Sequence, residues 1–260
     1  MKSINVGLIG SGFSAELHLE GYEKVYGVNV HLKAVASTNQ PVDQFAQKHG
    51  IEKTYRDYKE LLKDPDIDVV DICTPVLFHE QMIIDSIEAG KHVICEKPIT
   101  GYTGNQDENV GRTISKKEMY KSVVESLERM KQTIEGSDRL FMYAENWIYA
   151  PSILKSVEIL RAKKNKILFM LGEESHSGSH ATHAAQWNKT GGGSLIRQGC
   201  HPLSAILYLK KVEAEARGEK IEVESVIADV GVVTKCLSKE EMKHIAVRPV
   251  DVEDLASLNL

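Results

Sequence analysis

The stretch Ile4-Asn-Val-Gly-Leu-Ile-Gly-Ser-Gly-Phe-Ser-Ala15 decides the fold of this chain. Its first six residues have the apolar character of a buried strand, and the residues that follow are predicted to form a helix. Between them lies the pattern G-x-G-x-x-A, in which Gly10 and Gly12 allow a tight turn and a close backbone approach to a pyrophosphate. Ala15 takes the place of the third glycine, where helix and strand pack together. Glycines alone often indicate only a turn, but strand, turn and helix follow here in the order that dinucleotide binding requires.

The free N–H groups at the start of that helix are predicted to bind the pyrophosphate. The carboxyl ends of parallel strands meet at one edge of a sheet, so the turns at that edge are expected to face the cofactor as well. The cofactor-binding residues predicted on these grounds are Gly10, Ser11, Gly12, Phe13, Ser14, Ser37, Thr38, Asn39, Cys73, Thr74, Pro75 and His79. For His79, an ordinary place on a helix surface is the alternative.

The residues after the second predicted strand, 30–36, bear on the choice between NAD and NADP. A carboxylate there would bind the ribose 2′-hydroxyl and favour NAD. Ser37-Thr38-Asn39 has no carboxylate and no adjacent arginine, so NADP is slightly favoured. The alternative is that these three residues only cap the next helix.

A second decisive stretch is Lys91-His-Val-Ile-Cys-Glu-Lys-Pro-Ile99. Its apolar centre predicts a short buried strand, which ends at Glu96-Lys97 because Pro98 has no N–H to donate. Ligands bind at this edge of open α/β sheets. We therefore expect the preceding part of the chain to hold a cofactor and the following part to bring a substrate to Lys97.

Strands and helices alternate through residues 1–146, which predicts a right-handed, doubly wound parallel sheet, a Rossmann domain. Further strands are expected at residues 68–72 and 140–144. A capping box at Ser115-Lys-Lys-Glu118 is expected to start a helix that ends at Met130. Residues 101–112 contain three glycines and no apolar period, and they predict a surface loop that could act as a lid.

A second domain, α+β with a mostly antiparallel sheet, is predicted over residues 147–260. Its expected elements are a helix at 153–162, a strand at 167–174, a helix after Gly191-Gly-Gly193, a long strand at 221–236 and a strand that begins at 254. The second helix would carry Arg197 and His201 on one face, and Pro202 would kink it or end its first segment. A sheet of so few strands is a poor end for a domain, so we expect the chain to be C-terminally incomplete.

The composition argues against several classes of protein. The chain has 260 residues, 42% hydrophobic and 27% charged, as in ordinary globular proteins. Its net charge of −5, with both signs interspersed, argues against a nucleic-acid or membrane surface. With no signal peptide and no run of about 18 apolar residues, a cytoplasmic protein is expected.

The cysteines and histidines do not predict a metal site. Cys73, Cys95, Cys200 and Cys236 are widely spaced without a C-x-x-C pair, which indicates reduced thiols rather than a disulfide or zinc frame. Residues 175–190 hold three histidines, at positions 176, 180 and 183. A metal would also need carboxylate or thiolate partners, so we expect a polar loop that faces the substrate.

Four motifs in order give the chain a family resemblance: Gly10-x-Gly12-x-x-Ala15, Cys73-Thr-Pro75, Glu96-Lys97-Pro98 and Gly191-Gly-Gly-x-Leu-x-x-x-Gly-x-His201. Over nearly its whole length it resembles the Gfo/Idh/MocA oxidoreductases, which include inositol dehydrogenases and glucose–fructose oxidoreductase. The resemblance implies a Rossmann domain followed by an α+β domain whose open sheet often forms an oligomer interface. It therefore implies a homo-oligomer, dimer or tetramer, and further strands after Leu260.

The resemblance also implies a chemistry, the reversible transfer of hydride between nicotinamide C4 and a carbon of a sugar or polyol. Lys97 would hydrogen-bond the reacting oxygen, His201 would exchange its proton, and Glu96 would lie near the nicotinamide. Glu96 and Lys97 are therefore predicted to bind the cofactor as well. This fits the physical requirement that a nearby ammonium stabilises developing oxyanion charge. The substrate-binding residues expected on this basis are Asn146, Tyr149, His176, Trp187, Arg197 and His201.

One position departs from the family pattern. Members commonly carry aspartate one helical turn before the histidine, where this chain has Arg197. Arginine cannot act as a base, and it disfavours a second positive charge beside it. It could instead clamp a carboxylate or phosphate of an anionic substrate. The alternative is that Arg197 turns away and pairs with a carboxylate such as Glu145 or Glu173.

Three functions are consistent with the sequence. The first is an NAD(P)-dependent oxidoreductase acting on a sugar, a polyol or a related hydroxy compound. The second is a sensor that binds a dinucleotide and a sugar without catalysis. This possibility stays open because Arg197 stands where the family commonly has an aspartate. The third is redox-assisted glycoside cleavage, in which the nicotinamide is restored in each cycle.

Overall fold

A computed structural model of the chain describes residues 2–38, 41–104, 108–179 and 181–260. It divides into two compact units. The first comprises Met1–Thr100 and Lys117–Ala144, and the second comprises Gly101–Lys116 and Glu145–Leu260. The short segment Gly101–Lys116, which sequence analysis placed within the first domain, thus clusters with the second unit.

The first unit contains a parallel sheet of six strands in the order β3-β2-β1-β4-β5-β6. The strands are β1 (Lys2–Ile9), β2 (Val28–Ala36), β3 (Lys53–Tyr55), β4 (Val69–Ile72), β5 (His92–Cys95) and β6 (Phe141–Tyr143). The direction of winding reverses between β1 and β4, and in open α/β sheets a ligand binds at the carboxyl ends of the strands at this switch point. The doubly wound parallel fold expected from the sequence is confirmed.

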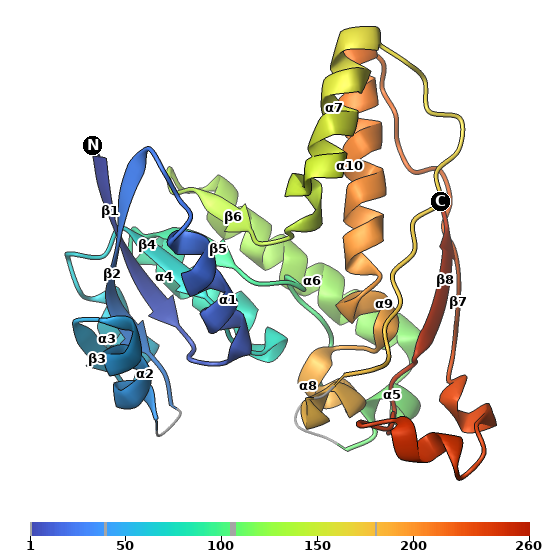
Figure 1. Ribbon diagram of the computed structural model, residues 1–260, viewed down its shortest axis with the longest axis horizontal. Helices are drawn as coiled ribbons and strands as arrows, with labels where there is room; N and C mark the ends of the chain where they lie inside the picture. Colours follow the sequence, from blue (N-terminus) through green and yellow to red (C-terminus); the bar gives the residue numbers. More distant parts are fainter. Residues whose placement is uncertain (1, 39–40, 105–107, 180) are drawn as a thin grey trace. The chain divides into compact units, whose positions relative to one another are not determined.

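Helices cover both faces of this sheet (Figure 1). They are α1 (Phe13–Tyr22), α2 (Val42–His49), α3 (Tyr58–Leu62), α4 (His79–Glu88) and α6 (Lys116–Glu135). Neighbouring residues of β1 point to opposite faces, so Leu8 packs with residues of α1 and α2, while Ile9 packs with residues of α3, α4 and α6. The helix expected to end at Met130 continues to Glu135, because Met130 and Ile134 pack on the core one turn apart.

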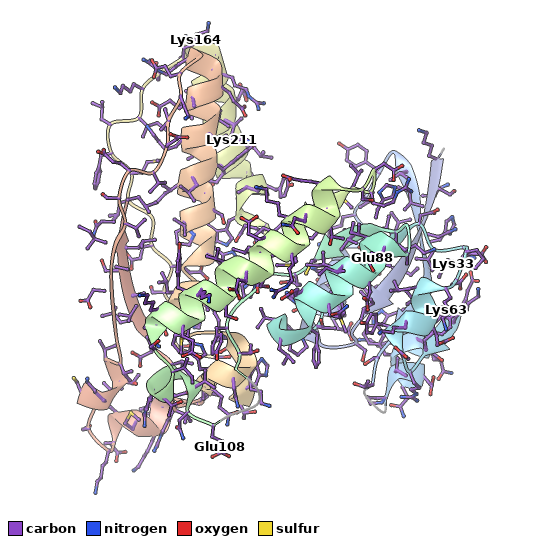
Figure 2. The ribbon with its side chains drawn as sticks, turned by 180° about the vertical axis from the view of Figure 1, so that it is seen from behind. Lys33, Lys63, Glu88, Glu108, Lys164 and Lys211 are labelled. Carbon is purple, nitrogen blue, oxygen red and sulfur yellow. The ribbon has the colours of Figure 1, made fainter. Side chains whose placement is uncertain are left out.

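Two long helices, α7 (Pro151–Lys163) and α10 (Cys200–Arg217), lie side by side in the second unit (Figures 1 and 2). Val157, Leu160 and Val212 are the buried residues of their shared core. Figure 2 labels Lys164, which follows α7, and Lys211 on α10. This unit also contains the antiparallel pair β7 (Ile227–Gly231) and β8 (Leu255–Asn259), the short helices α5 (Val110–Thr113), α8 (Trp187–Thr190) and α9 (Ser194–Arg197), and several single turns of 3-10 helix. No described helix is long and apolar enough to cross a membrane.

Two strand predictions in this unit are wrong. Residues 167–174 form no strand, and Leu168, Phe169 and Leu171 are 88%, 81% and 83% exposed. Within the described residues no strand pairs with this segment, and a strand without a partner leaves its backbone hydrogen bonds unmade. The strand expected over residues 221–236 is limited to Ile227–Gly231, the part that pairs with β8.

The prediction of a surface loop at residues 101–112 is confirmed only in part. Residues 101–104 have no regular structure and residues 108 and 109 are exposed, but helix α5 starts at Val110. Val110 is fully buried, and the Gly111 N–H donates to the Asp251 carboxylate over 2.9 Å. A side chain at Gly111 would collide with the Asp251 backbone, only 2.1 Å from the added Cβ. The segment is therefore packed into the second unit.

Arg197 and His201 do not share one helix as predicted. Arg197 ends α9, and the chain turns at Gln198-Gly199 before α10 begins at Cys200. Gly199 permits the turn because an added Cβ would lie 2.7 Å from the Leu195 carbonyl oxygen. Pro202 does not kink the helix, since it lies in the first turn of α10, where an N–H has no intrahelical acceptor.

Candidate active site

The glycine turn of the first unit is shaped for a close approach by another molecule. Gly10 has a φ of 109°, and a Cβ there would lie 2.4 Å from the Cys73 carbonyl oxygen, so only glycine fits. A Cβ added at Gly12 would meet nothing within 4 Å, and no side chain caps the helix that starts after it. Phe13 is 78% exposed, whereas Ala15 is fully buried against the sheet. The free N–H groups of α1 can therefore bind an anion, as a pyrophosphate site requires.

Two serines meet at the carboxyl ends of β1 and β2. The Ser11 hydroxyl donates to the Ser37 hydroxyl over 2.9 Å, and both side chains are half-buried. Ser14 lies in the first turn of α1, and Thr38 is exposed next to Ser37. Asn39 lies outside the described residues. The structure thus brings the predicted cofactor residues of the glycine turn after β1 together with those that follow β2.

His79 connects the turn after β4 with the segment after β5. The ring is 1% exposed, with Nε2 2.8 Å from the Thr74 carbonyl oxygen and Nδ1 2.9 Å from that of Pro98. Burial lowers the pKa of His79 against the pull of these two carbonyl groups. The alternative of an ordinary surface place is therefore wrong: the ring ties Thr74, beside Pro75, to the Glu96-Lys97-Pro98 motif. A role of His79 at the cofactor stays a prediction.

Glu96 is held by both of its oxygens. Oε1 lies 3.0 Å from His18 Nε2, and Oε2 accepts a hydrogen bond from the Lys97 N–H over 2.9 Å. Burial opposes ionisation of Glu96, but the hydrogen bond and charge of His18 keep its pKa below the usual value. The backbone that carries the half-buried Lys97 is thereby fixed at the carboxyl end of β5.

In the second unit, His201 pairs with Glu145. His201 Nδ1 lies 2.8 Å and 2.9 Å from the two Glu145 oxygens, and the residues are 7% and 2% exposed. A carboxylate only accepts, so Nδ1 carries the proton and Nε2 is left to exchange one with a substrate. The Trp147 N–H donates to Glu145 Oε1 over 2.9 Å, and the Trp147 ring stacks on His201 at 5.7 Å between centroids.

Glu145 thus bonds His201, although sequence analysis considered it only as a partner for Arg197. Arg197 lies half-buried, 3.4 Å from the Ser179 hydroxyl. Burial lowers the pKa of Arg197, and burial together with the Arg197 charge lowers the pKa of His183. Arg197 is thus a partly desolvated cation, and the guanidinium group is of the type that binds carboxylates and phosphates.

The other expected substrate residues are spread over the second unit. Asn146 and Tyr149 line one pocket together with Trp147. The Trp187 indole N–H donates to the Tyr102 carbonyl oxygen, and the Lys116 ammonium lies 3.8 Å from its ring centroid, so this side chain packs internally. His176 is exposed and accepts from the Gly178 N–H. His180 lies outside the described residues.

The glycine-rich segment before α9 binds a carboxylate of the protein itself. The Gly193 N–H lies 3.0 Å from both Glu253 oxygens, and the Leu195 N–H donates to one of them. A Cβ at Gly193 would lie 2.0 Å from the Glu253 carbonyl oxygen, which explains the requirement for glycine. This contact positions the start of α9.

Two clusters of described residues hold metal-ligand atoms within 4.8 Å of one another: His18 with Asp71 and Cys73, and His201 with Glu145 and Cys200. In each, histidine Nδ1 already bonds a carboxylate. His18, Asp71 and Trp147 were missed by sequence analysis. Asp71 had a signal, an acidic residue inside the apolar run Val69-Val-Asp-Ile72.

The chain is similar in sequence to a known family of oxidoreductases and to individual members of it. The Gfo/Idh/MocA family model, described as an oxidoreductase family with an NAD-binding Rossmann fold, matches residues 4–135, just over half of the chain. Levoglucosan dehydrogenase of Pseudarthrobacter phenanthrenivorans is 38% identical over 107 residues, 38% of this chain and 27% of that protein. Myo-inositol 2-dehydrogenase of Thermotoga maritima is 30% identical over 111 residues, 42% of this chain and 33% of that protein.

A solved structure of levoglucosan dehydrogenase in complex with NADH and L-sorbose shares the fold, with a TM-score of 0.73 at 24% identity. The match covers 99% of this chain and 63% of that one, so the chain spans less than two thirds of these relatives. The sequence motifs, the six-stranded sheet and the family match agree. The chain belongs to the Gfo/Idh/MocA family of oxidoreductases, which have an NAD-binding Rossmann fold.

Proposed function

We propose that this protein is an NAD(P)-dependent oxidoreductase that moves hydride between the nicotinamide and a carbon of a sugar, a polyol or a related hydroxy compound. The observation that carries the proposal is the buried Glu145–His201 pair. A carboxylate that fixes a histidine in one tautomer prepares the other ring nitrogen to accept a proton. Removal of hydride from a carbinol carbon requires such a base.

The glycine turn supports dinucleotide binding, because Gly10 and Gly12 leave room beside the free N–H groups of α1. NAD(P), when bound, supplies the carbon that takes up or gives back the hydride. In the oxidative direction, His201 Nε2 accepts the hydroxyl proton of the substrate, and Glu145 stabilises the resulting imidazolium. Lys97, which follows β5, would supply an ammonium that stabilises negative charge on a substrate oxygen as it develops. Glu96, which fixes the Lys97 N–H, lies beside the nicotinamide in this proposal.

Two features bear on the substrate. The relatives are named for levoglucosan and myo-inositol, which supports a cyclic polyhydroxy compound. Trp147 and Tyr149, 37% and 65% exposed in one pocket, offer ring faces to the C–H surface of such a molecule. Arg197 supports a carboxylate on the substrate, so uronates are included in the class we propose.

For the cofactor, we propose that NADP is accepted at least as well as NAD. Ser37 and Thr38 after β2 carry no charge to repel a 2′-phosphate. The Ser37 hydroxyl, anchored by Ser11, is a neutral neighbour for either ribose.

The proposal is tested by mixing the protein with NAD or NADP and a panel of sugars, inositols and uronates while the nicotinamide absorbance is followed. Appearance of the reduced nicotinamide band with one class of compound is the expected result. Tight cofactor binding without any absorbance change would favour a sensor. Release of sugar from a glycoside with no net cofactor change would favour redox-assisted cleavage.

A further inference from the structure

A half-buried histidine of α1, His18, lies between two carboxylates of the first unit. His18 Nδ1 lies 2.8 Å from Asp71 Oδ2, and Nε2 lies 3.0 Å from Glu96 Oε1. Asp71 is fully buried in the middle of the sheet, and the His18 and Glu96 side chains are each 17% exposed. Three separate elements, α1, β4 and the end of β5, therefore meet at one imidazole.

The hydrogen bonds define the charge of that imidazole. Both partners are carboxylates that only accept, so both ring nitrogens must donate, and only the imidazolium carries two N–H groups. A neutral ring would leave one buried carboxylate facing a lone pair. Burial opposes the charge, but the bonds to Asp71, Cys73 and Glu96 raise the pKa of His18 to about 12.

The other groups around His18 fit this state. The Tyr22 hydroxyl, one turn later on α1, donates to Asp71 Oδ2 over 2.7 Å. Burial raises the pKa of the Cys73 thiol to about 12, and its sulfur lies 3.5 Å from His18 Nδ1. A protonated thiol is a poor metal ligand, and Nε2 is already engaged by Glu96, so a proton rather than a metal ion is the occupant that the geometry favours.

The second carboxylate oxygen of Glu96 contacts the backbone of Lys97. Glu96 Oε2 accepts from the Lys97 N–H, so a continuous chain of hydrogen bonds runs from Tyr22 through Asp71, His18 and Glu96 to the Lys97 backbone. The same helix α1 begins at the glycine turn. Side-chain hydrogen bonds between charged groups thus connect helix α1 directly to the backbone of Lys97.

We propose that His18 is a positioning residue: as a half-buried imidazolium it fixes Glu96, and through Glu96 the backbone of Lys97, relative to helix α1. This rests on the proposed function, in which Lys97 acts on the substrate oxygen. His18 itself touches neither substrate nor reacting atoms in this role. Its loss leaves Glu96 without its charged donor and lets the Lys97 backbone shift, and shifts of about 1 Å cost up to a hundredfold in rate.

The first arm of the test examines the charge directly in the unaltered full-length chain. Histidine labelled with nitrogen-15 is followed by NMR between pH 5.5 and 8.5, and the His18 signals are assigned by their loss in His18→Gln. Both ring nitrogens are expected to stay protonated throughout. A His18 ring that titrates in this range, or that is neutral at pH 7, overturns the proposal whether or not the protein oxidises any sugar. Stoichiometric zinc binding that removes the His18 proton signals overturns it as well.

The second arm measures positioning. His18→Leu removes both donors, and kcat is expected to fall tenfold to a hundredfold while cofactor affinity stays within about threefold. The pKa of Glu96 then rises, because only the N–H and the charge of Lys97 still oppose the effect of burial, so the acidic limb of kcat/KM moves to higher pH by about one unit or more. His18→Gln keeps one donor and is expected to recover part of the loss. His31→Gln, at an exposed histidine on β2, is the matched control and leaves kcat unchanged. Unaltered kcat and pH profile in a folded His18→Leu protein overturn the proposal, whereas absence of turnover in the unaltered chain contradicts the proposed function and leaves the NMR arm decisive.

Discussion

Glu145 and His201 form a buried carboxylate–imidazole pair, although 56 residues separate them in the chain. Glu145 directly follows the first unit, after β6, and His201 lies in the first turn of α10. The family commonly has an aspartate one turn before this histidine, and Arg197 stands there instead. The Glu145 carboxylate contacts His201 from a different element, so the arginine does not leave His201 without an acidic partner.

Replacing Glu145 with glutamine tests this pair. The amide can donate as well as accept, so it no longer favours the tautomer with the proton on Nδ1, and it cannot stabilise the imidazolium. We expect kcat to fall by about a hundredfold or more, with cofactor affinity unchanged. Steady-state kinetics of Glu145→Gln beside Glu173→Gln, at an exposed glutamate, measure the effect. Equal rates in the two variants would remove Glu145 from the mechanism.

The charge of His18 predicts a pH dependence of stability. Its pKa is about 12 in the folded chain against an ordinary 6.5, so the stabilisation is complete below pH 6.5 and is lost progressively as the pH rises toward 12. A reference variant, His18→Gln/Asp71→Asn/Glu96→Gln, replaces the network with groups that do not titrate. The free energy of unfolding of both proteins is measured with urea. We expect the difference between the unaltered chain and this variant to decrease from pH 6.5 to 8.5, by at most about 1.4 kcal/mol per pH unit. A difference that stays constant across this window would show that His18 is not charged.

Ser37 governs cofactor choice in our account. An aspartate at this position would repel the 2′-phosphate of NADP and accept the 2′-hydroxyl of NAD. We expect Ser37→Asp to lower kcat/KM with NADP by about tenfold or more and to leave NAD within about threefold. Ser37→Asn has nearly the same size without the charge, and it serves as the control. If both variants affect NADP equally, the effect is steric and the electrostatic argument is wrong.

We propose that Arg197 separates anionic from neutral substrates. Replacing it with methionine keeps an apolar stem and removes the guanidinium fork that binds carboxylates. We expect KM for a uronate to rise about tenfold or more in Arg197→Met, with a smaller rise in Arg197→Lys. KM for the corresponding neutral sugar should change little. A parallel rise for both compounds would mean that Arg197 shapes the pocket without binding a substrate charge.

The fold of the first unit was accessible from sequence because its signals are local. Apolar runs of strand length, glycine at helix ends and the G-x-G-x-x-A turn each act within a few residues. Helix α2, for example, ends at Gly50 in the left-handed conformation, which glycine adopts without strain. Such features need no knowledge of distant contacts.

The errors arise where distant parts of the chain decide the structure. Residues 167–174 have the composition of a strand, but a strand also needs a neighbour to pair with. Residues 101–112 lack an apolar period, yet Gly111 fits against Asp251, 140 residues away. No pattern within either segment carries that information.

For the candidate site too, local motifs could be predicted from the sequence, whereas contacts between distant residues could not. The Glu96-Lys97-Pro98 motif and the glycine turn stood out because their spacing is local. The partners of Glu96 and His201 did not, since His18 lies 78 residues from Glu96 and Glu145 lies 56 residues from His201. Buried charges such as Asp71 are the best available sequence signal, because a carboxylate inside an apolar strand requires a partner.

The most direct test of the central claim is to follow deuterium from a substrate labelled at the reacting carbon to nicotinamide C4, in the unaltered chain and in Lys97→Met. We predict that the label appears at C4 of the reduced cofactor in the unaltered chain, with a primary isotope effect on the transfer step. In Lys97→Met we predict a loss of transfer of about a thousandfold, with cofactor affinity nearly intact. Transfer at an unchanged rate in Lys97→Met, or tight cofactor binding without transfer from any sugar, polyol or uronate, would contradict the account.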